Sequence, residues 1–115
     1  MRYALLVSHN EDAVISPQEA ARREAALAAF LHDAQERGVL AGSEQLHPAS
    51  TATTVRAWDG GDVFIGTGSA TQSQEPISGV FLIESKDLDE AVTVATRVPA
   101  AWYGTVEVRQ VLDCV

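Results

Sequence analysis

The sequence predicts a single α+β domain in which two helices cover one face of an antiparallel sheet. Three observations support this prediction. The chain has 115 residues, which is the length of one domain. Hydrophobic residues make up 46% of it and charged residues 21%, a balance typical of a folded globular chain rather than a disordered one. The apolar patterns follow the order strand, helix, strands, strand, helix, strand.

The first strand and first helix are predicted from the opening third of the chain. Residues 2–8 form a short apolar run without helix caps, which indicates a buried strand. Ser16 can cap a helix, with Pro17 at its first position and Glu19 placed for a capping box. Gly38 can end the helix in a left-handed conformation. The predicted apolar stripe of this helix consists of Leu27, Phe30, Leu31 and Ala34.

The middle of the chain changes to strand and turn patterns. Residues 39–46 are predicted to form a strand. Residues 53–58 and 63–65 are rich in β-branched and aromatic side chains, and the turn at 59–62 joins them into a hairpin. Residues 66–76 are small and polar, which predicts a loop.

The last third of the chain predicts a central strand, a second helix and a final strand. Residues 79–84 are apolar almost throughout, as in a strand buried in the middle of a sheet. Asp87 can cap the second helix, which Pro99 ends. Residues 105–111 form the last predicted strand. The predicted buried stripe of the second helix consists of Leu88, Ala91, Val92 and Ala95.

This order is that of a split βαβ, ferredoxin-like fold with a β-hairpin inserted after the first helix. One core is expected between the helices and the sheet, built from Leu27, Phe30, Leu31, Phe81, Ile83, Leu88 and Val92. Residues 80–83 are apolar on both faces of the sheet, yet two helices can cover only one face. The sequence therefore predicts that a second copy of the chain covers the other face, giving a homodimer.

Charge, cysteine content and the length of the apolar runs indicate which partners and which cellular compartment to expect. Sixteen acidic against eight basic residues give a formal net charge of −8, which repels both nucleic acid and anionic membranes. The single cysteine, Cys114, excludes an intrachain disulfide and a cysteine zinc cluster, and it fits a reduced cytoplasm. The apolar runs are too short for a signal peptide or a membrane span.

Two histidines are the candidate catalytic residues. His9 follows the first strand and His47 ends the strand before the hairpin, and a histidine can act as acid or base near neutral pH. The alternative for each is a solvated surface histidine. No pair of histidines has the spacing that places two metal ligands on one element, so no metal site is predicted. The glycines at 66 and 68 lack the lysine of a phosphate loop, and no cofactor is predicted.

Three further residues are candidates for ligand contacts. Thr67 and Ser69 lie in the predicted polar loop, and Arg56 lies on a predicted strand, where it could bind a carboxylate. The alternative for Arg56, as for Arg109, is an ion pair between strands or between subunits with Glu107 or Glu84. Trp102 and Tyr103 are expected to close an edge of the core or an interface.

Five stretches of the chain stand in the order and spacing of a known family. The chain resembles the YCII-related proteins, in particular the branch known by its Asp-Gly-Pro-Phe motif. The likeness runs through nearly the whole chain. It is carried by residues 52–56, Asp59-Gly60, 79–83, 87–91 and 106–109.

The resemblance implies a ferredoxin-like fold that pairs into a dimeric α/β barrel. It also implies a small bacterial cytoplasmic protein, often encoded beside a sigma factor, and the wider family is suspected of enzymatic activity through a histidine and an aspartate. The namesake motif falls at residues 67–70, where only Gly68 matches. Thr67 replaces the aspartate, Ala70 replaces the aromatic ring, and Gln72 replaces a following acidic residue.

Two functions remain open at this point. The first is a dimeric protein that binds a small organic molecule where His9, His47 and the loop at 67–69 converge. There a histidine would move the proton, because threonine cannot near neutral pH. The second is a non-catalytic accessory or regulatory partner in a sigma-factor or stress-response system.

Overall fold

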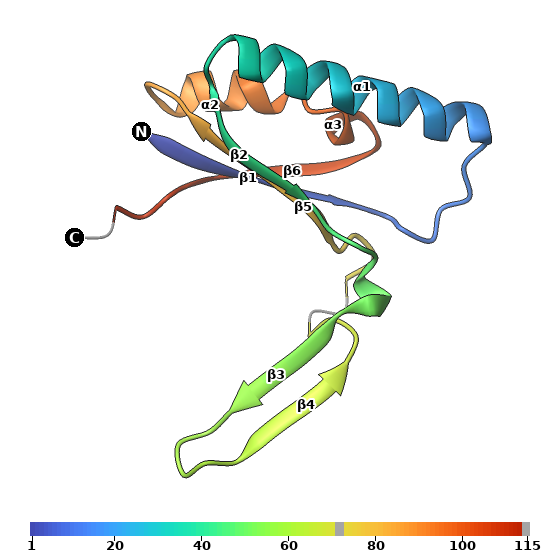
Figure 1. The fold of residues 1–115 in the computed structure, drawn as a ribbon, viewed down its shortest axis with the longest axis vertical. Helices are drawn as coiled ribbons and strands as arrows, with labels where there is room; N and C mark the ends of the chain where they lie inside the picture. The colour runs from blue at the N-terminus through green and yellow to red at the C-terminus, as the bar shows by residue number, and fades with distance from the viewer. Residues whose placement is uncertain (71–72, 114–115) are drawn as a thin grey trace.

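The computed structural model describes residues 1–70 and 73–113, so Gln72 and Cys114 lie outside the described residues. It contains a four-stranded antiparallel sheet with the order β2-β5-β1-β6 and a separate two-stranded sheet, β3-β4 (Figure 1). This arrangement confirms the ferredoxin-like fold with an inserted hairpin. The elements are β1 (Arg2–His9), α1 (Pro17–Glu36), β2 (Leu40–Gln45), the 3-10 helix η1 (Ala49–Thr51), β3 (Thr53–Ala57), β4 (Val63–Thr67), β5 (Ile77–Glu84), α2 (Leu88–Ala95), α3 (Ala100–Tyr103) and β6 (Gly104–Gln110).

Helices α1 and α2 begin directly after the predicted capping residues, Ser16 and Asp87. The Ser16 hydroxyl accepts a hydrogen bond from the Glu19 amide at 3.0 Å, and an Asp87 carboxylate oxygen accepts one from the Glu90 amide at 2.9 Å. These bonds satisfy amides that have no partner within the helix. Only this half of the predicted capping box at Ser16 is seen, because the Glu19 carboxylate pairs with arginines instead. Gly38 follows the end of α1 with φ at 69°, as predicted.

One face of the sheet carries the core. Leu5 and Phe81 face each other across β1 and β5 and are fully buried, together with Ile83. Phe30 of α1 meets Phe81 edge to face, with ring centroids 5.2 Å apart, an arrangement that aromatic rings favour. Figure 1 shows α1, α2 and α3 on this same side of the sheet.

The buried stripe of α2 differs from the predicted one. Leu88 and Val92 are 53% and 44% exposed, so the prediction that they belong to the core is wrong. Ala91 and Ala95 are buried as predicted, and Val94 is buried with them. The predicted and observed stripes overlap and both repeat at helical spacing, so the period alone does not distinguish them.

The other face of the sheet has an apolar centre. Leu6 pairs with Val80, and Ala4 pairs with Leu82, so these four side chains lie side by side on the face away from Leu5 and Phe81. All four are half-buried. In the described part of the chain, no helix lies over this face. We call these four residues the open face.

β4 extends two residues further than predicted, through Gly66 and Thr67, and β3 ends one residue earlier, at Ala57. The register pairs Thr53 with Thr67, so Thr67 ends β4 and the loop begins at Gly68. Figure 1 shows the hairpin projecting away from the sheet on the side opposite the helices.

Replacing the ring of Phe30 tests the packing of α1 on the sheet. We expect Phe30→Ala to lower the free energy of unfolding by about 3–5 kcal/mol, because it removes a buried ring and leaves a cavity. Leu88→Ala is the control and should cost less than about 1 kcal/mol, since its side chain is largely exposed. Chemical denaturation measures both, and a Phe30→Ala loss as small as that of the control would show that α1 is wrongly placed.

Candidate functional site

His9 ends β1 on the helix side of the sheet, in a hollow of about 140 Å³. The floor of this hollow is apolar. Four polar or aromatic side chains reach it from different elements: His9 from β1, Gln45 from β2, Ser78 from β5 and Tyr103 from α3. An apolar hollow with a few convergent polar groups is the usual form of a small-molecule site.

Two backbone features fix the position of His9. The pairing of β1 with β5 shifts register between Val7 and Ser8, and such irregularities turn side chains in new directions. On the other side, His9 pairs with Gly104 of β6. A Cβ atom at residue 104 would collide with the Ser8 carbonyl oxygen and lie 2.8 Å from the His9 Cβ. The close approach of these strands therefore requires a glycine there.

The Ser78 hydroxyl lies between His9 and the backbone of β1. It is 3.0 Å from His9 Nδ1 and 3.4 Å from the Val7 carbonyl oxygen. A hydroxyl has one proton, so when it donates to the carbonyl it can only accept from Nδ1–H. In that arrangement Nε2 of the neutral ring carries no proton.

The ring of Tyr103 contacts the ring of His9. The two rings meet edge to face at 5.7 Å, and the Arg23 guanidinium lies 3.8 Å from the centre of the Tyr103 ring. Burial raises the pKa of Tyr103 above its ordinary value of 10.0, against the opposing effect of Arg23, with Glu19 adding to the rise. The phenol therefore stays protonated at neutral pH and can donate a hydrogen bond.

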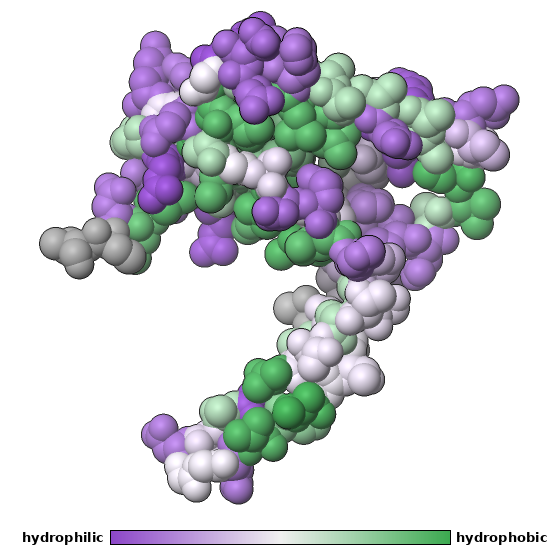
Figure 2. Space-filling model, in the orientation of Figure 1, coloured by the Kyte–Doolittle hydropathy of each residue, from purple (hydrophilic) through white to green (hydrophobic). Residues whose placement is uncertain are grey.

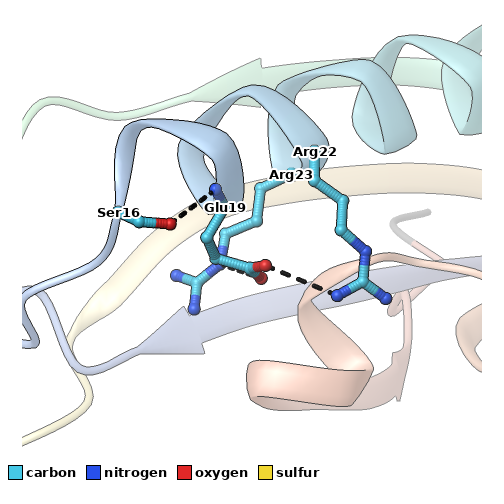
Figure 3. A network of polar contacts seen from close by, with 4 residues as sticks. All are labelled: Ser16, Glu19, Arg22 and Arg23. Atoms are coloured by element: carbon cyan, nitrogen blue, oxygen red, sulfur yellow. Dashed lines mark hydrogen bonds and ion pairs between the residues drawn. The ribbon is translucent and has the colours of Figure 1, made fainter.

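The N-terminal turns of α1 support this arrangement (Figure 3). The Glu19 carboxylate lies between two arginines, 3.2 Å from Arg23 Nε and 3.4 Å from a terminal nitrogen of Arg22. Arg22 in turn lies 4.1 Å from the centre of the Trp102 ring. These contacts join α1 to α3 and so fix the tyrosine that contacts His9.

His47 and Ser69 share a second hollow of about 380 Å³ at the base of the hairpin. Leu46 lines both hollows, so they adjoin. The loop after β1 reaches the same region, where the Glu11 carboxylate accepts a hydrogen bond from the Ala49 amide at 3.1 Å. The structure thus places His47 and Ser69 around one hollow and His9 in another, and Leu46 lines both.

The other two predicted ligand residues lie on the hairpin. Thr67 is exposed at the end of β4, and Arg56 is exposed opposite Phe64 on β3. They are outside the residues that line the two hollows, and their role in binding stays a prediction. The Arg109 guanidinium lies 3.8 Å from the Glu107 carboxylate, but both residues are on β6, so this is a pair within one strand and not the expected pair between strands or subunits.

Sequence reasoning missed three members of the His9 hollow. Gln45 and Ser78 are ordinary polar residues near strand ends. Only the pairing of β5 with β1 on one side and with β2 on the other brings them beside His9. Tyr103 had a signal, since an aromatic pair after the second helix was expected at an edge of the core. Its contact with His9 could not be read from the sequence, because it depends on the fold of α3.

A larger hollow lies elsewhere and offers less chemistry. It measures about 640 Å³ between α1 and the segment that contains α2 and α3, and it is lined mainly by alanines, Phe30 and Pro99. Its acid, Asp33, already pairs with Arg37. Residues 1–70 and 73–113 contain no cluster of side chains that could hold a metal ion, and no helix among them is long and apolar enough to cross a membrane.

Comparisons with known proteins address the fold and the family. No curated protein matches the sequence. Among solved structures, the chain is similar to 5-chloro-2-hydroxyhydroquinone dehydrochlorinase (TftG) from Burkholderia phenoliruptrix AC1100, in complex with 2,5-dihydroxybenzoquinone. The TM-score is 0.55 and the identity 15%, over 97% of this chain and 94% of that one, so the likeness shows the fold alone. Membership of the Asp-Gly-Pro-Phe branch stays a prediction. The family model of the YCII-related domain matches residues 1–115, and the chain therefore belongs to the YCII-related domain family.

Proposed function

We propose that this protein binds a small hydroxylated ring compound in the hollow at His9, and that His9 Nε2 accepts a proton from it. The observation that carries the proposal is the contact of His9 Nδ1 with the Ser78 hydroxyl at 3.0 Å. In the proposed site the neutral ring carries its proton on Nδ1, so Nε2 is unprotonated, and a general base needs that state.

The size and lining of the hollow support a compound with one ring. At about 140 Å³, the hollow is smaller than the roughly 300–1,000 Å³ usual for ligand pockets. Gln45 and Tyr103 offer hydrogen-bonding groups around the apolar floor. The similar structure of TftG contains 2,5-dihydroxybenzoquinone, a compound of this class, which makes it a suitable probe.

His47 and Ser69 are proposed to extend the site into the adjoining hollow. No aspartate stands at the loop position held by Thr67, so proton transfer falls to a histidine. Arg56 and Thr67 are retained as proposed ligand contacts. The location in the cytoplasm, inferred from cysteine usage, likewise stays a prediction.

We further propose that the protein is a homodimer whose sheets pack through the open face. Leu6, Val80 and Leu82 form an apolar centre that nothing in a single described chain covers. Burying apolar surface of this kind is the main driving force for association. We expect the whole dimer interface, of which the open face is one part, to bury more than about 1,200 Å² in total.

Ligand binding tests the role of His9. We expect 2,5-dihydroxybenzoquinone to bind the wild-type protein in calorimetry, and His9→Asn to weaken binding at least tenfold. Asparagine can keep a donor for Ser78 but lacks Nε2. His32→Asn, on the exposed side of α1, is the control and should bind as the wild type does. Equal binding by the His9 variant would contradict the proposal, and no binding by the wild type would favour the accessory function.

Nitrogen NMR tests the tautomer independently of any ligand. We expect the neutral His9 ring to carry its proton on Nδ1 in the wild type. Ser78→Ala should increase the population with the proton on Nε2, because the acceptor for Nδ1–H is lost. A His9 ring protonated on Nε2 in the wild type would contradict its role as a base.

A glycine substitution tests the strand contact that positions His9. We expect Gly104→Ala to weaken probe binding, because its methyl group must displace the Ser8 carbonyl or the His9 side chain. Gly42→Ala is the matched control, since a Cβ there meets only a Leu82 methyl group at 3.9 Å. Calorimetry measures both, and equal affinity in the two variants would show that the close approach does not position His9.

A further inference from the structure

We infer that the β3–β4 hairpin is an arm that packs its aliphatic face against a second copy of this chain. The inference rests on the proposed homodimer and extends it to a separate part of the molecule. The aliphatic face consists of Val55, Ala57, Val63 and Ile65.

The register of the hairpin places these side chains together. Val55 pairs with Ile65 and Ala57 pairs with Val63, so all four point to one side of the two-stranded sheet. Val55, Val63 and Ile65 are 62%, 58% and 68% exposed in the single chain. Figure 2 shows hydrophobic side chains gathered on the hairpin, away from the body of the protein. An exposed aliphatic patch of this kind marks an interaction surface.

Two hydrogen bonds close the base of the hairpin. The Gly68 amide donates to the Ala52 carbonyl oxygen, and the Thr54 hydroxyl donates to the Gly68 carbonyl oxygen, both at 2.7 Å. Beyond these bonds the hairpin stands clear of the body (Figure 1). The radius of gyration is 16.3 Å, against about 13 Å for a compact chain of similar length. An isolated two-stranded hairpin is marginally stable in water, so the projecting strands need a partner.

The direction of the hairpin favours a second copy as that partner. It projects on the side opposite the helices, which is the side of the open face (Figure 1). A molecule packed on the open face therefore lies in the angle between the sheet and the hairpin. A second copy carries the same two apolar surfaces, the open face and the aliphatic face of the hairpin. In a two-fold dimer each contact occurs twice, so both surfaces of both chains are covered.

The area of the two surfaces also supports a pair of identical chains. With strands about 4.8 Å apart and a rise of about 3.3 Å per residue, the open side of the four-stranded sheet measures roughly 440 Å². Two such faces bury about 900 Å², which is below the roughly 1,200 Å² of a standard interface. Each hairpin face adds about 160 Å², so the open faces and the hairpin faces of both chains together bury roughly 1,200 Å², the lower end of a standard interface.

Sedimentation equilibrium on the full chain tests the arm. We expect the wild type to be a dimer, and Val55→Asp with Ile65→Asp to weaken dimerisation at least 100-fold, because four carboxylates would be buried per dimer. Ala21→Asp with Ala28→Asp is the matched control. It adds the same charge on the exposed side of α1 and should leave the dimer unchanged.

Photo-crosslinking of the purified protein identifies the contact directly. We expect benzoylphenylalanine at position 65 to give a covalent dimer, and the same group at position 28 to give none. A hairpin variant that dimerises as tightly as the wild type, or no crosslink from position 65, would overturn the inference while the sheet-to-sheet dimer stands. A monomeric wild type would overturn both, and the probe-binding test of His9 would still decide the ligand site separately.

Discussion

The pairing of β1 with β5 is the contact on which the rest of the structure depends. Leu5 and Phe81 meet across this pair and are almost completely buried, so a slip of one residue would turn the core side chains toward the open side. The same register brings Ser78 to the end of β1, where His9 stands. One antiparallel pair therefore sets the core and the candidate site together.

The site forms where this regular pairing breaks down. The register shift after Val7 accompanies a carbonyl oxygen that accepts from Ser78, and Ser78 in turn contacts His9. Gly104 lets β6 approach the same point from the other side. In a regular ladder the backbone N–H and C=O groups bond to the neighbouring strands. At this irregular strand end, such groups are available to bond to side chains of the site.

Much of the fold follows from local signals in the sequence. Ser16, Asp87 and Gly38 act where the capping rules place them, and the turn at 59–62 joins two strands as expected. The sequence alone could not show which face of α2 is buried. Two overlapping stripes of apolar residues repeat at the same helical period, and only packing against the sheet decides between them. Of the site, His9 was foreseeable as a histidine after an apolar strand. Its partners Gln45, Ser78 and Tyr103 come from distant parts of the chain, and their proximity is a property of the fold.

The connection between β2 and β5 has a consequence for how the family can vary. These strands are neighbours, with Gln45 paired with Gly79 and the Leu46 amide bonded to the Ser78 carbonyl oxygen. The segment between them therefore leaves and re-enters the sheet at adjacent points. Doubling the length of such an excursion costs only about 0.6 kcal/mol in chain entropy. Insertions and deletions in this segment can thus accumulate during evolution with little effect on folding of the sheet.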